Sequence, residues 1–560
     1  MVQRFSSIEK FLLIQIAFIF LLRTHLAFVF EINWDEFYFL SHIYQYQRGE
    51  LTGVFQTSFV HLFTWLPLVG SNEVDQVILA RLLMLIVNGI TAYFLYKICR
   101  LAVSRPSALL AIALYFSFSF IFRHGASFRS DPMITCLLIS SVWLVISPGK
   151  TTLKLILAGA LIGLAGSFNI KSVLYAPLFG VYYLYNFLRA KDKTTILSTI
   201  KEATGLLLIA AGSFVMIYIF HKATLPTDGS ATQYITGAAS KTFSVDIFPQ
   251  PYHLNNAFVG NLIFIVILCL GAGYSVIITK DHVPCDAKPS LHPFVGLGFC
   301  LVLLSLIFYR NSFPYFYLFA LAPCIVVLAL GVRLLESSRF KTIYALVVCL
   351  PAIMATILYN NIFHQTNTNQ KLYLSVIHKT FPEPVSYFDR STMVASFPKK
   401  GFFMSTWGIE NYVENRIPVF KNIVELEAPA FLLENSPLLS LDESENTYLV
   451  SLLATDQHIL NENYLPFWGR LRVLGKSVTL SNEDSPVSFQ IFREGHYTNK
   501  DIAPVIINEQ TVMPGEALYL TKGVHTARST LADQHLRLLW GENLSTPIQP
   551  APDGPIFTKF

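Results

Sequence analysis

Apolar and polar positions divide the chain into two parts. Up to about residue 360, long apolar runs alternate with short polar stretches, whereas shorter runs follow one another beyond that point. A membrane-spanning helix needs about 20 apolar residues, and eleven runs come close to this length. We therefore predict about eleven spans, with a bend near 169–172. The runs cover about residues 10–30, 76–98, 106–122, 132–147, 153–170, 172–188, 203–221, 257–279, 292–309, 313–332 and 342–360.

The part after residue 360 has patterns typical of water-exposed domains. A polar linker at 360–370 separates it from the last apolar run, and apolar runs then alternate with helical stretches up to about residue 475. From 476 to 560, short alternating strands lie between turn residues, which favours a small β-sandwich. The pattern thus predicts three domains: a membrane domain over 1–360, an α/β domain over 361–475 and a β-rich domain over 476–560. The expected strands of the last are 487–492, 517–520 and 536–540.

Composition supports the membrane assignment. The 560 residues are 53% hydrophobic and 14% charged, with a mean hydropathy of +0.48, which excludes an ordinary soluble protein of this size. Residues 1–360 hold 25 Lys and Arg against 15 Asp and Glu, and residues 361–560 hold 16 against 21. The two balances, +10 and −5, sum to the net charge of +5 and indicate regions in different surroundings.

Lys and Arg positions predict the orientation of the spans. If the N-terminus lies on the cytoplasmic side, sixteen of the 25 cations fall in cytoplasmic loops, in agreement with the positive-inside rule. Eleven spans then place the C-terminal region on the opposite side. The predicted fold is therefore a polytopic α-helical membrane protein with an extracytoplasmic α/β plus β-sandwich region. A long outer loop over about 31–75, rich in aromatic residues, is expected to form helices lying along the membrane interface.

The outer side of the predicted membrane domain carries few polar residues. Acids and cations occur there together, although the positive-inside rule should deplete the cations; each cation alone could simply reach lipid headgroups. Cations can neutralise a phosphate leaving group, and a carboxylate can take a proton from an attacking hydroxyl. No phosphate-binding glycine loop is present, so a lipid-linked donor is favoured. These residues are Asp35, Glu36, Arg123, His124, Arg129, Asp131, Lys171, Arg310 and Asn311.

The order of these motifs resembles that of the GT-C superfamily of membrane glycosyltransferases, over roughly residues 8–335. The similar motifs are Arg23 before the acidic motif Trp34-Asp35-Glu36, VHLFTWLP with His61, Arg81 in an ARLL pattern, Arg129-Ser130-Asp131-Pro132, FNIKSVLYAP with Lys171, and FYRNSFPYFYLFALAP with Arg310 and Tyr315. The likeness is to the protein O-mannosyltransferase, aminoarabinose-transferase and lipopolysaccharide-core glycosyltransferase types. This chain departs from the pattern at Asn169, Ile170 and Ser172 beside Lys171, and at Leu62 after His61.

The resemblance implies a role for each residue. Asp35 would be the general base, and Glu36 would orient it or, with Asp131, support a metal or the donor. Arg129, Lys171 and Arg310 would bind the donor phosphate, with His61 and Tyr315 as further candidates. Arg23 and Arg81 would be structural and pair with acids. One base and a phosphate leaving group imply inversion at the anomeric carbon, because retention would need a second carboxylate as nucleophile.

The implied function is that of an inverting glycosyltransferase. It would move a hexosyl or pentosyl unit from a polyprenyl-phosphate donor to an extracytoplasmic acceptor: lipopolysaccharide, another glycan, a lipid or a protein. The alternatives are a lipid-linked-sugar flippase or transporter, and a glycan ligase. A divalent metal (Mg, Mn or Ca) is a candidate cofactor, whereas a nucleotide cofactor and a nucleic-acid partner are not expected. The location implied is a membrane, with compact loops typical of a bacterial inner membrane and a periplasmic active site. In the C-terminal region, Asp389, Arg390 and Trp407 fit either a sugar site or a surface ion pair with a core aromatic.

Overall fold

The computed structural model divides the chain into two compact units. Unit 1 comprises Met1–Phe30, Tyr46–Leu66 and Ile78–Gln365, and unit 2 comprises Glu31–Gln45, Pro67–Val77 and Thr366–Phe560. The second unit therefore takes two short pieces from the first outer loop as well as the C-terminal region. The residues described are 6–226, 247–277, 291–336, 340–441, 452–480, 486–529, 534–542 and 544–558.

Unit 1 is helical, and helix occurs in each of the eleven apolar runs. Several runs form two or three short helices rather than one long helix. The elements are α1 (Ser7–Val29), α3 (Val60–Phe63), α4 (Glu73–Cys99), α5 (Arg105–Phe116), α6 (Ser119–His124), α7 (Ser130–Ile146), α8 (Thr152–Phe168), η2 (Ile170–Tyr175), α9 (Ala176–Arg189), α10 (Lys193–Ala223), α12 (Pro251–Gly260), α13 (Leu262–Ile277), α14 (Pro293–Phe299), η4 (Cys300–Leu304), α15 (Ser305–Phe308), α16 (Phe316–Leu321), η5 (Ala322–Cys324), α17 (Ile325–Leu335) and α18 (Lys341–Ile362).

Five helices in the described part of the chain are long and apolar enough to cross a membrane. They are α1, α4, α10, the continuous stretch Phe316–Leu335 and α18. The pair α12 and α13 would add a sixth span, bent by 87°. Shorter apolar helices occupy Arg105–Phe116, Ser130–Ile146, Thr152–Phe168 and Pro293–Phe308. The chain is thus a helical membrane protein with five or six candidate spans, and the larger number of eleven stays a prediction.

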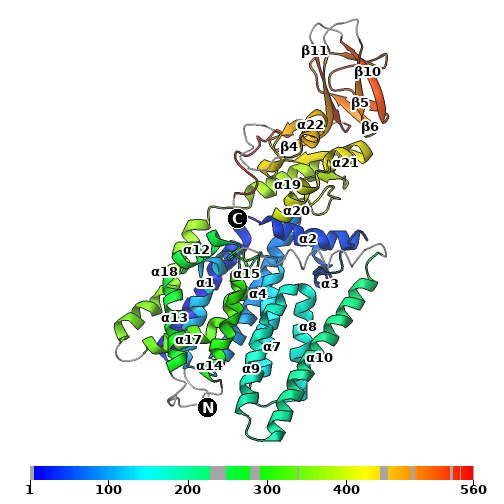
Figure 1. Ribbon diagram of the computed structural model, residues 1–560. Helices are drawn as coiled ribbons and strands as arrows, with labels where there is room; N and C mark the ends of the chain where they lie inside the picture. The colour runs from blue at the N-terminus through cyan, green and yellow to red at the C-terminus, as the bar shows by residue number, and fades with distance from the viewer. Residues whose placement is uncertain are drawn as a thin grey trace. The chain divides into compact units, whose positions relative to one another are not determined.

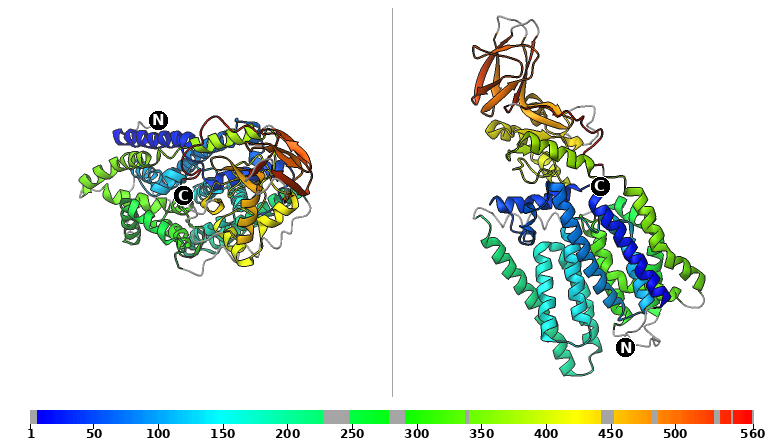
Figure 2. Two further views of the ribbon diagram at one scale, coloured as in Figure 1. Left: turned by 90° about the horizontal axis from the view of Figure 1, so that it is seen from above. Right: turned by 180° about the vertical axis from the view of Figure 1, so that it is seen from behind.

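Burial shows which helices are central in unit 1. The most apolar 18-residue stretch of Phe316–Leu335 is 89% buried, whereas that of α10 is only 11% buried. Helices α7, α8, α9 and α10 lie side by side (Figure 1), with α8 between α7 and α10. The opposite part of the unit contains α1, which packs between α5 and α18 (Figure 2). The exposed apolar side chains of α10 and α18 suit a lipid surrounding.

Glycines allow the closest helix contacts in unit 1. A Cβ atom on Gly271 of α13 would lie 1.9 Å from the carbonyl oxygen of Val327, and one on Gly331 of α17 would lie 2.0 Å from that of Ile267. The two helices therefore cross backbone against backbone. Small residues at membrane helix interfaces permit this approach and the packing contacts that come with it.

Unit 2 contains two sheets and several helices. The larger sheet has the order β1-β2-β4-β11-β6-β9, with β3 also paired to β4, and the smaller has the order β5-β10-β7-β8. Its elements are α2 (Trp34–Gln47, within this unit up to residue 45), η1 (Leu66–Leu68), α19 (Thr368–Thr380), β1 (Tyr387–Phe388), α20 (Thr406–Asn415), α21 (Val419–Glu427), β2 (Phe431–Leu433), η7 (Pro437–Leu439), α22 (Ala454–Asn463), β3 (Tyr464–Trp468), β4 (Leu471–Leu480), β5 (Val487–Ile491), β6 (Gly495–Asn499), β7 (Val505–Ile507), β8 (Gln510–Val512), β9 (Ala517–Leu520), β10 (Gly523–Ser529) and β11 (Gln534–Trp540).

The three strands predicted near the C-terminus are confirmed as β5, β9 and β11. Side chains from both sheets share one apolar core, which includes Leu480, Phe489, Val505 and Leu538. The C-terminal region is thus a mixed β-sheet region, and the finer β-sandwich assignment stays a prediction. Strand β4 pairs with β2 and β3 through its first residues and with β11 through its last. It runs through the predicted boundary at 475/476, so the three-domain division stays a prediction.

Candidate functional site

Three polar residues of unit 1 are placed by the ends of neighbouring helices. Arg129 has an extended backbone and precedes α7, so Asp131 lies in the first helical turn. Helix α8 ends at Asn169, whose side-chain oxygen accepts a hydrogen bond from the Lys171 amide over 3.1 Å. The Asn169 amide nitrogen donates to the Ser130 hydroxyl over 3.0 Å. This bond joins the two helix ends and brings Lys171 to Asp131.

The resulting Lys171 cluster consists of Arg129, Asp131, Lys171 and Tyr315. The Lys171 ammonium donates to Asp131 Oδ1, and Arg129 Nε lies 3.5 Å from Asp131 Oδ2. The Arg129 guanidinium lies 3.4 Å from the centre of the Tyr315 ring. The Lys171 and Asp131 side chains are only 3% and 2% exposed. Two cations thus face one carboxylate with little water present, and their hydrogen-bond donors suit an anion.

Further cations act on His124, the last residue of α6. Burial and then the charges of Arg123, Arg129 and Arg81 hold the pKa of His124 well below 6.5, so these guanidinium groups act on a common region. Arg81 Nη1 donates to the Phe30 carbonyl over 2.8 Å, and Arg123 Nη2 donates to Gln365 Oε1 over 2.7 Å. The end of unit 1 that carries α6 and the start of α7 is therefore strongly basic.

Two further candidates, Arg310 and His61, also belong to unit 1. The main-chain carbonyl of half-buried Arg310 accepts a hydrogen bond from Gln250 over 3.1 Å. His61 lies 2.9 Å from His221 Nδ1, and His221 Nε2 lies 2.8 Å from the Thr57 hydroxyl. Sequence reasoning missed His221; its only sequence signal is a histidine in the last turn of a predicted span.

Arg23 is structural in a different way from the one expected. Its guanidinium lies over the rings of Phe20 and Phe116, at 5.4 and 5.2 Å. Among the described residues, its three nitrogens have no hydrogen-bond partner. The expected pairing with an acid is therefore wrong for Arg23. Gly125 allows this placement, because a Cβ there would lie 2.6 Å from an Arg23 nitrogen.

The acidic motif begins α2 and belongs to unit 2. Asn33 caps the helix, since its side-chain oxygen accepts from the Asp35 amide over 2.9 Å. Glu36 Oε2 accepts from the Asn33 amide over 3.1 Å, which completes a reciprocal capping arrangement. Glu36 is fully buried, whereas Asp35 is partly exposed. The two adjacent carboxylates thus differ in surroundings: Glu36 caps the start of the helix, and Asp35 is the more exposed of the two.

Asp389 and Arg390 do not form the surface ion pair that was one of the two expectations, and a sugar site stays a prediction. Asp389 is buried and accepts hydrogen bonds from the amides of Thr392 and Met393 and from Asn435 Nδ2. Burial raises its pKa above the usual range. The neighbouring Arg390 guanidinium lies 4.3 Å from the centre of the Trp34 ring. This stretch therefore supports the acidic motif through Trp34.

The carboxylates fit a metal poorly. Asp131 is engaged by two cations, and Glu36 caps a helix. Within the ranges that the structure describes, no group of three or more His, Cys, Asp or Glu side chains could hold a metal ion. The described residues of each unit thus show no such group by themselves, and a divalent cofactor stays a prediction.

Comparisons with known proteins identify the fold. No protein-family model matches the chain, and no curated protein matches it by sequence. The oligosaccharyltransferase of Archaeoglobus fulgidus has a similar structure, with a TM-score of 0.54 at 12% identity over 96% of this chain and 98% of that one. ArnT from Cupriavidus metallidurans, solved with undecaprenyl phosphate bound, gives 0.52 at 12% identity over 76% and 93%.

The chain has the GT-C fold. Both similar structures are glycosyltransferases of that class, so the resemblance seen in the motifs is confirmed at the level of fold. Within the GT-C fold of this chain, Arg129, Asp131, Lys171 and Tyr315 are brought together in unit 1. Asp35 and Glu36 lie together in unit 2.

Proposed function

We propose that this protein is an inverting glycosyltransferase that uses a polyprenyl-phosphate-linked sugar. The observation that carries the proposal is the buried Lys171 cluster, in which two cations share one carboxylate within a GT-C fold. The donor phosphate, a diester between polyprenol and sugar, is an anion that suits these cations and their hydrogen-bond donors. The undecaprenyl phosphate bound by the similar ArnT structure supports this donor class.

In the proposed reaction, the acceptor hydroxyl attacks the anomeric carbon of the donor sugar. The bond from that carbon to the phosphate oxygen breaks, and the electron pair leaves with the polyprenyl phosphate. Lys171 and Arg129 stabilise the charge that develops on this leaving group. Asp131 keeps both cations in place, and Asp35 takes the proton of the hydroxyl. Displacement in one step inverts the anomeric configuration.

The proposed setting is the outer face of a membrane, with the donor in the bilayer and the acceptor on the side of unit 2. The Lys and Arg asymmetry of the loops supports a cytoplasmic N-terminus and a periplasmic unit 2. The acceptor class would be lipopolysaccharide, another glycan, a lipid or a protein. Arg310 is proposed as a further phosphate ligand, and His61 as a residue at the edge of the site.

A glycan ligase acting on a lipid diphosphate is the second candidate. The likeness to the archaeal oligosaccharyltransferase covers 96% of the chain and therefore includes unit 2. Transfer of a whole oligosaccharide would use the same base and the same cations. The two candidates differ in the donor, and a direct assay separates them.

The test uses purified protein in nanodiscs and radiolabelled polyprenyl-phosphate and polyprenyl-diphosphate sugars, with membrane extract as acceptor. We expect turnover with a monophosphate donor. Asp35→Asn should lower turnover by about 10²-fold, because the base is lost. Lys171→Met should weaken donor use by about 10- to 100-fold, the effect of one charged hydrogen bond. The exposed Lys222→Met on α10 is the matched control.

Each outcome decides one part of the proposal. Turnover with the diphosphate donor alone would favour the ligase. Unchanged turnover in Asp35→Asn would remove Asp35 as the base. No turnover with any donor, combined with movement of labelled lipid across the bilayer, would replace the transferase by a flippase.

A further inference from the structure

A segment near the end of the chain returns along unit 2 to the acidic motif. We call residues 544–558 the C-terminal strap. Its main-chain carbonyls accept hydrogen bonds from side chains along its length: Leu544 from Lys500 Nζ over 2.6 Å, Gln549 from Trp468 Nε1 over 2.8 Å, and Gly554 from Arg470 Nε over 3.2 Å. Because the bonds use carbonyls, they fix the course of the strap without depending on its side chains.

The last described residues of the strap contact the start of α2. The Phe557 ring meets the rings of Trp34 and Phe37 edge to face, at centroid distances of 6.3 and 6.1 Å. The Thr558 amide lies 2.9 and 3.0 Å from the two Glu31 carboxylate oxygens, and its hydroxyl donates to Glu31 Oε2. Glu31 is buried, and these hydrogen bonds from Thr558 stabilise its carboxylate there.

A second set of contacts holds Trp34. The Arg390 guanidinium stacks on its ring, and Arg390 is itself fixed by Ser436 Oγ at 3.1 Å and the Met404 carbonyl at 3.2 Å. Phe557 and Arg390 thus both fix the residue immediately before Asp35. The amide and carbonyl of Ile32 also bond to Gln370.

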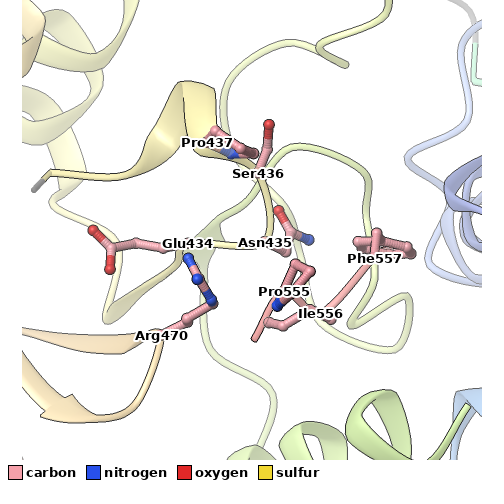
Figure 3. Close-up of a pocket in the computed structure, with 8 residues that line it drawn as sticks. All are labelled: Glu434, Asn435, Ser436, Pro437, Arg470, Pro555, Ile556 and Phe557. Carbon is pink, nitrogen blue, oxygen red and sulfur yellow. The ribbon is translucent and has the colours of Figure 1, made fainter. Parts of the chain in front are cut away.

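The strap is not packed tightly along its whole course. A pocket of about 230 Å³ lies between it and the loop after β2. Figure 3 shows Phe557 on the opposite side of this pocket from Glu434. The pocket is bounded by Glu434, Asn435, Ser436, Pro437, Arg470, Pro555, Ile556 and Phe557. The strap is therefore held by a few defined contacts, and these can be removed one at a time.

We propose that Phe557 and Thr558 are positioning residues for Asp35. This inference rests on the proposed function, in which Asp35 is the base. Asp35 is the second residue of α2, and its direction depends on the position of the first helical turn. Phe557 contacts Trp34, immediately before Asp35, and Phe37, two residues after it. Thr558 binds Glu31, two residues before the cap Asn33. Loss of these contacts would let the carboxylate shift, and a shift of about 1 Å can cost 10²-fold in rate.

The test compares full-length variants in nanodiscs with the labelled donor. Phe557→Ala and Thr558→Val each remove one contact, and Thr558→Val keeps the main-chain bonds to Glu31, so it is the milder change. Phe557→Tyr and Thr558→Ser are conservative versions. Gln549→Ala is the matched control, because Gln549 is exposed and contributes its carbonyl to the strap.

We expect kcat to fall about tenfold or more in Phe557→Ala and Thr558→Val, with the KM for the donor unchanged, because the proposed phosphate ligands belong to unit 1. The conservative versions should restore kcat. In an Asp35→Asn background, the strap variants should cause no further loss, since they act through Asp35.

Three results would overturn the inference while leaving the proposed function intact: normal kcat in both strap variants, a loss that multiplies with that of Asp35→Asn, or an equal loss in Gln549→Ala. If Asp35→Asn alone keeps full activity, the base assignment itself fails. Thermal unfolding of Thr558→Val within a few degrees of wild type ensures that the rate is measured on folded protein.

Discussion

The Lys171–Asp131 pair shows how a buried charge decides the chemistry of a site. Removing either partner from a buried pair leaves an uncompensated charge, which costs about 3–5 kcal/mol. The exposed pair of Lys150 and Glu202 lacks this sensitivity, since surface pairs contribute about 0–1 kcal/mol. On the proposed function, the donor phosphate would bind to Lys171 and Arg129. Donor binding should then raise the stability of the folded protein, because a ligand that binds only the folded state stabilises it.

A single histidine should make the stability of the protein depend on pH. His378 Nε2 lies 2.9 Å from Glu73 Oε2. Burial lowers the pKa of His378, but the hydrogen bond and charge of Glu73 outweigh burial and raise it above 6.5. The protonated form is thus favoured in the folded protein. The resulting stability is fully present below pH 6.5 and is lost as the pH rises through the raised pKa.

Thermal unfolding between pH 5.5 and 8.5 measures this effect. The difference in Tm between wild type and His378→Gln should be largest at the acidic end and should shrink toward pH 8.5. His458→Gln is the control, because His458 forms an exposed pair with Glu462. A constant difference across the range would contradict the prediction.

At the residue scale, the sequence predicted that Arg129, Asp131 and Lys171 belong together better than it predicted the residues that hold such groups in place. Arg129, Asp131 and Lys171 could be found because each lies at the end of an apolar run. The bond between Asn169 and Ser130 and the stacking of Arg390 on Trp34 could not, since they join residues 39 and 356 positions apart. The surroundings of Arg23 were not predicted, because the sequence does not reveal that Phe116, from another helix, packs against its guanidinium.

At the scale of elements, the crossing of α13 and α17 is the closest described contact of unit 1 and should be the most sensitive to volume. Gly271→Leu would place a side chain where a carbonyl oxygen already lies within 1.9 Å of its Cβ. We expect the free energy of unfolding to fall by at least about 1–3 kcal/mol. The measurement is a lower Tm and a lower yield of folded protein.

Gly273→Leu is the matched control for this change. It lies on the same helix, two residues away, with no atom within 4 Å of its Cβ position. Both variants add the same leucine side chain, so they differ only in whether that side chain meets a neighbouring helix. Equal Tm values for the two variants would show that the helix crossing is looser than described.

The positions of the helices were predictable from apolar runs, but their breaks were not. The bend between α12 and α13 falls at Asn261, whose side chain accepts from the Ser119 amide and donates to the Ser119 hydroxyl. An apolar run with one internal Asn looks like a straight span in sequence. Ser119, whose hydrogen bonds with Asn261 stabilise the bend, is 142 residues away in the sequence.

At the scale of the whole molecule, unit 2 is assembled from separate stretches of the chain. The fragment 366–560 alone lacks α2, so Phe403 loses the Tyr38 ring stacked on it at 4.2 Å, and Gln370 loses Ile32. We expect this fragment to be less stable than unit 2 in the full protein. A synthetic peptide of residues 31–47 should bind it and raise its Tm, because a ligand that binds only the folded state stabilises it.

The peptide variant Trp34→Ala is the control for this experiment, since it removes the contacts to Arg390 and Phe557. It should raise the Tm less than the wild-type peptide at equal concentration. Equal effects of the two peptides, or none, would contradict a specific docking of α2.

The predicted boundaries were drawn where composition changes, at 360 and 475. The composition of a segment reflects whether lipid or water surrounds it, whereas a compact unit is defined by contacts between residues. Residues 31–45 look like a loop of the membrane domain in the sequence, because apolar runs enclose them. In the structure they group with residues 67–77 and 366–560. Strand β4 runs without a break from Leu471 to Leu480, across the boundary predicted at 475.

The bond between Thr558 and Glu31 joins residues 527 positions apart, and this separation has a consequence for synthesis. At about 5–20 residues per second, a ribosome adds Thr558 roughly half a minute to two minutes after Glu31. Throughout that interval, the helix carrying Asp35 has left the ribosome without its support. On the proposed function, a chain that still lacks Thr558 would already carry the basic cluster, while the contacts that position Asp35 have yet to form.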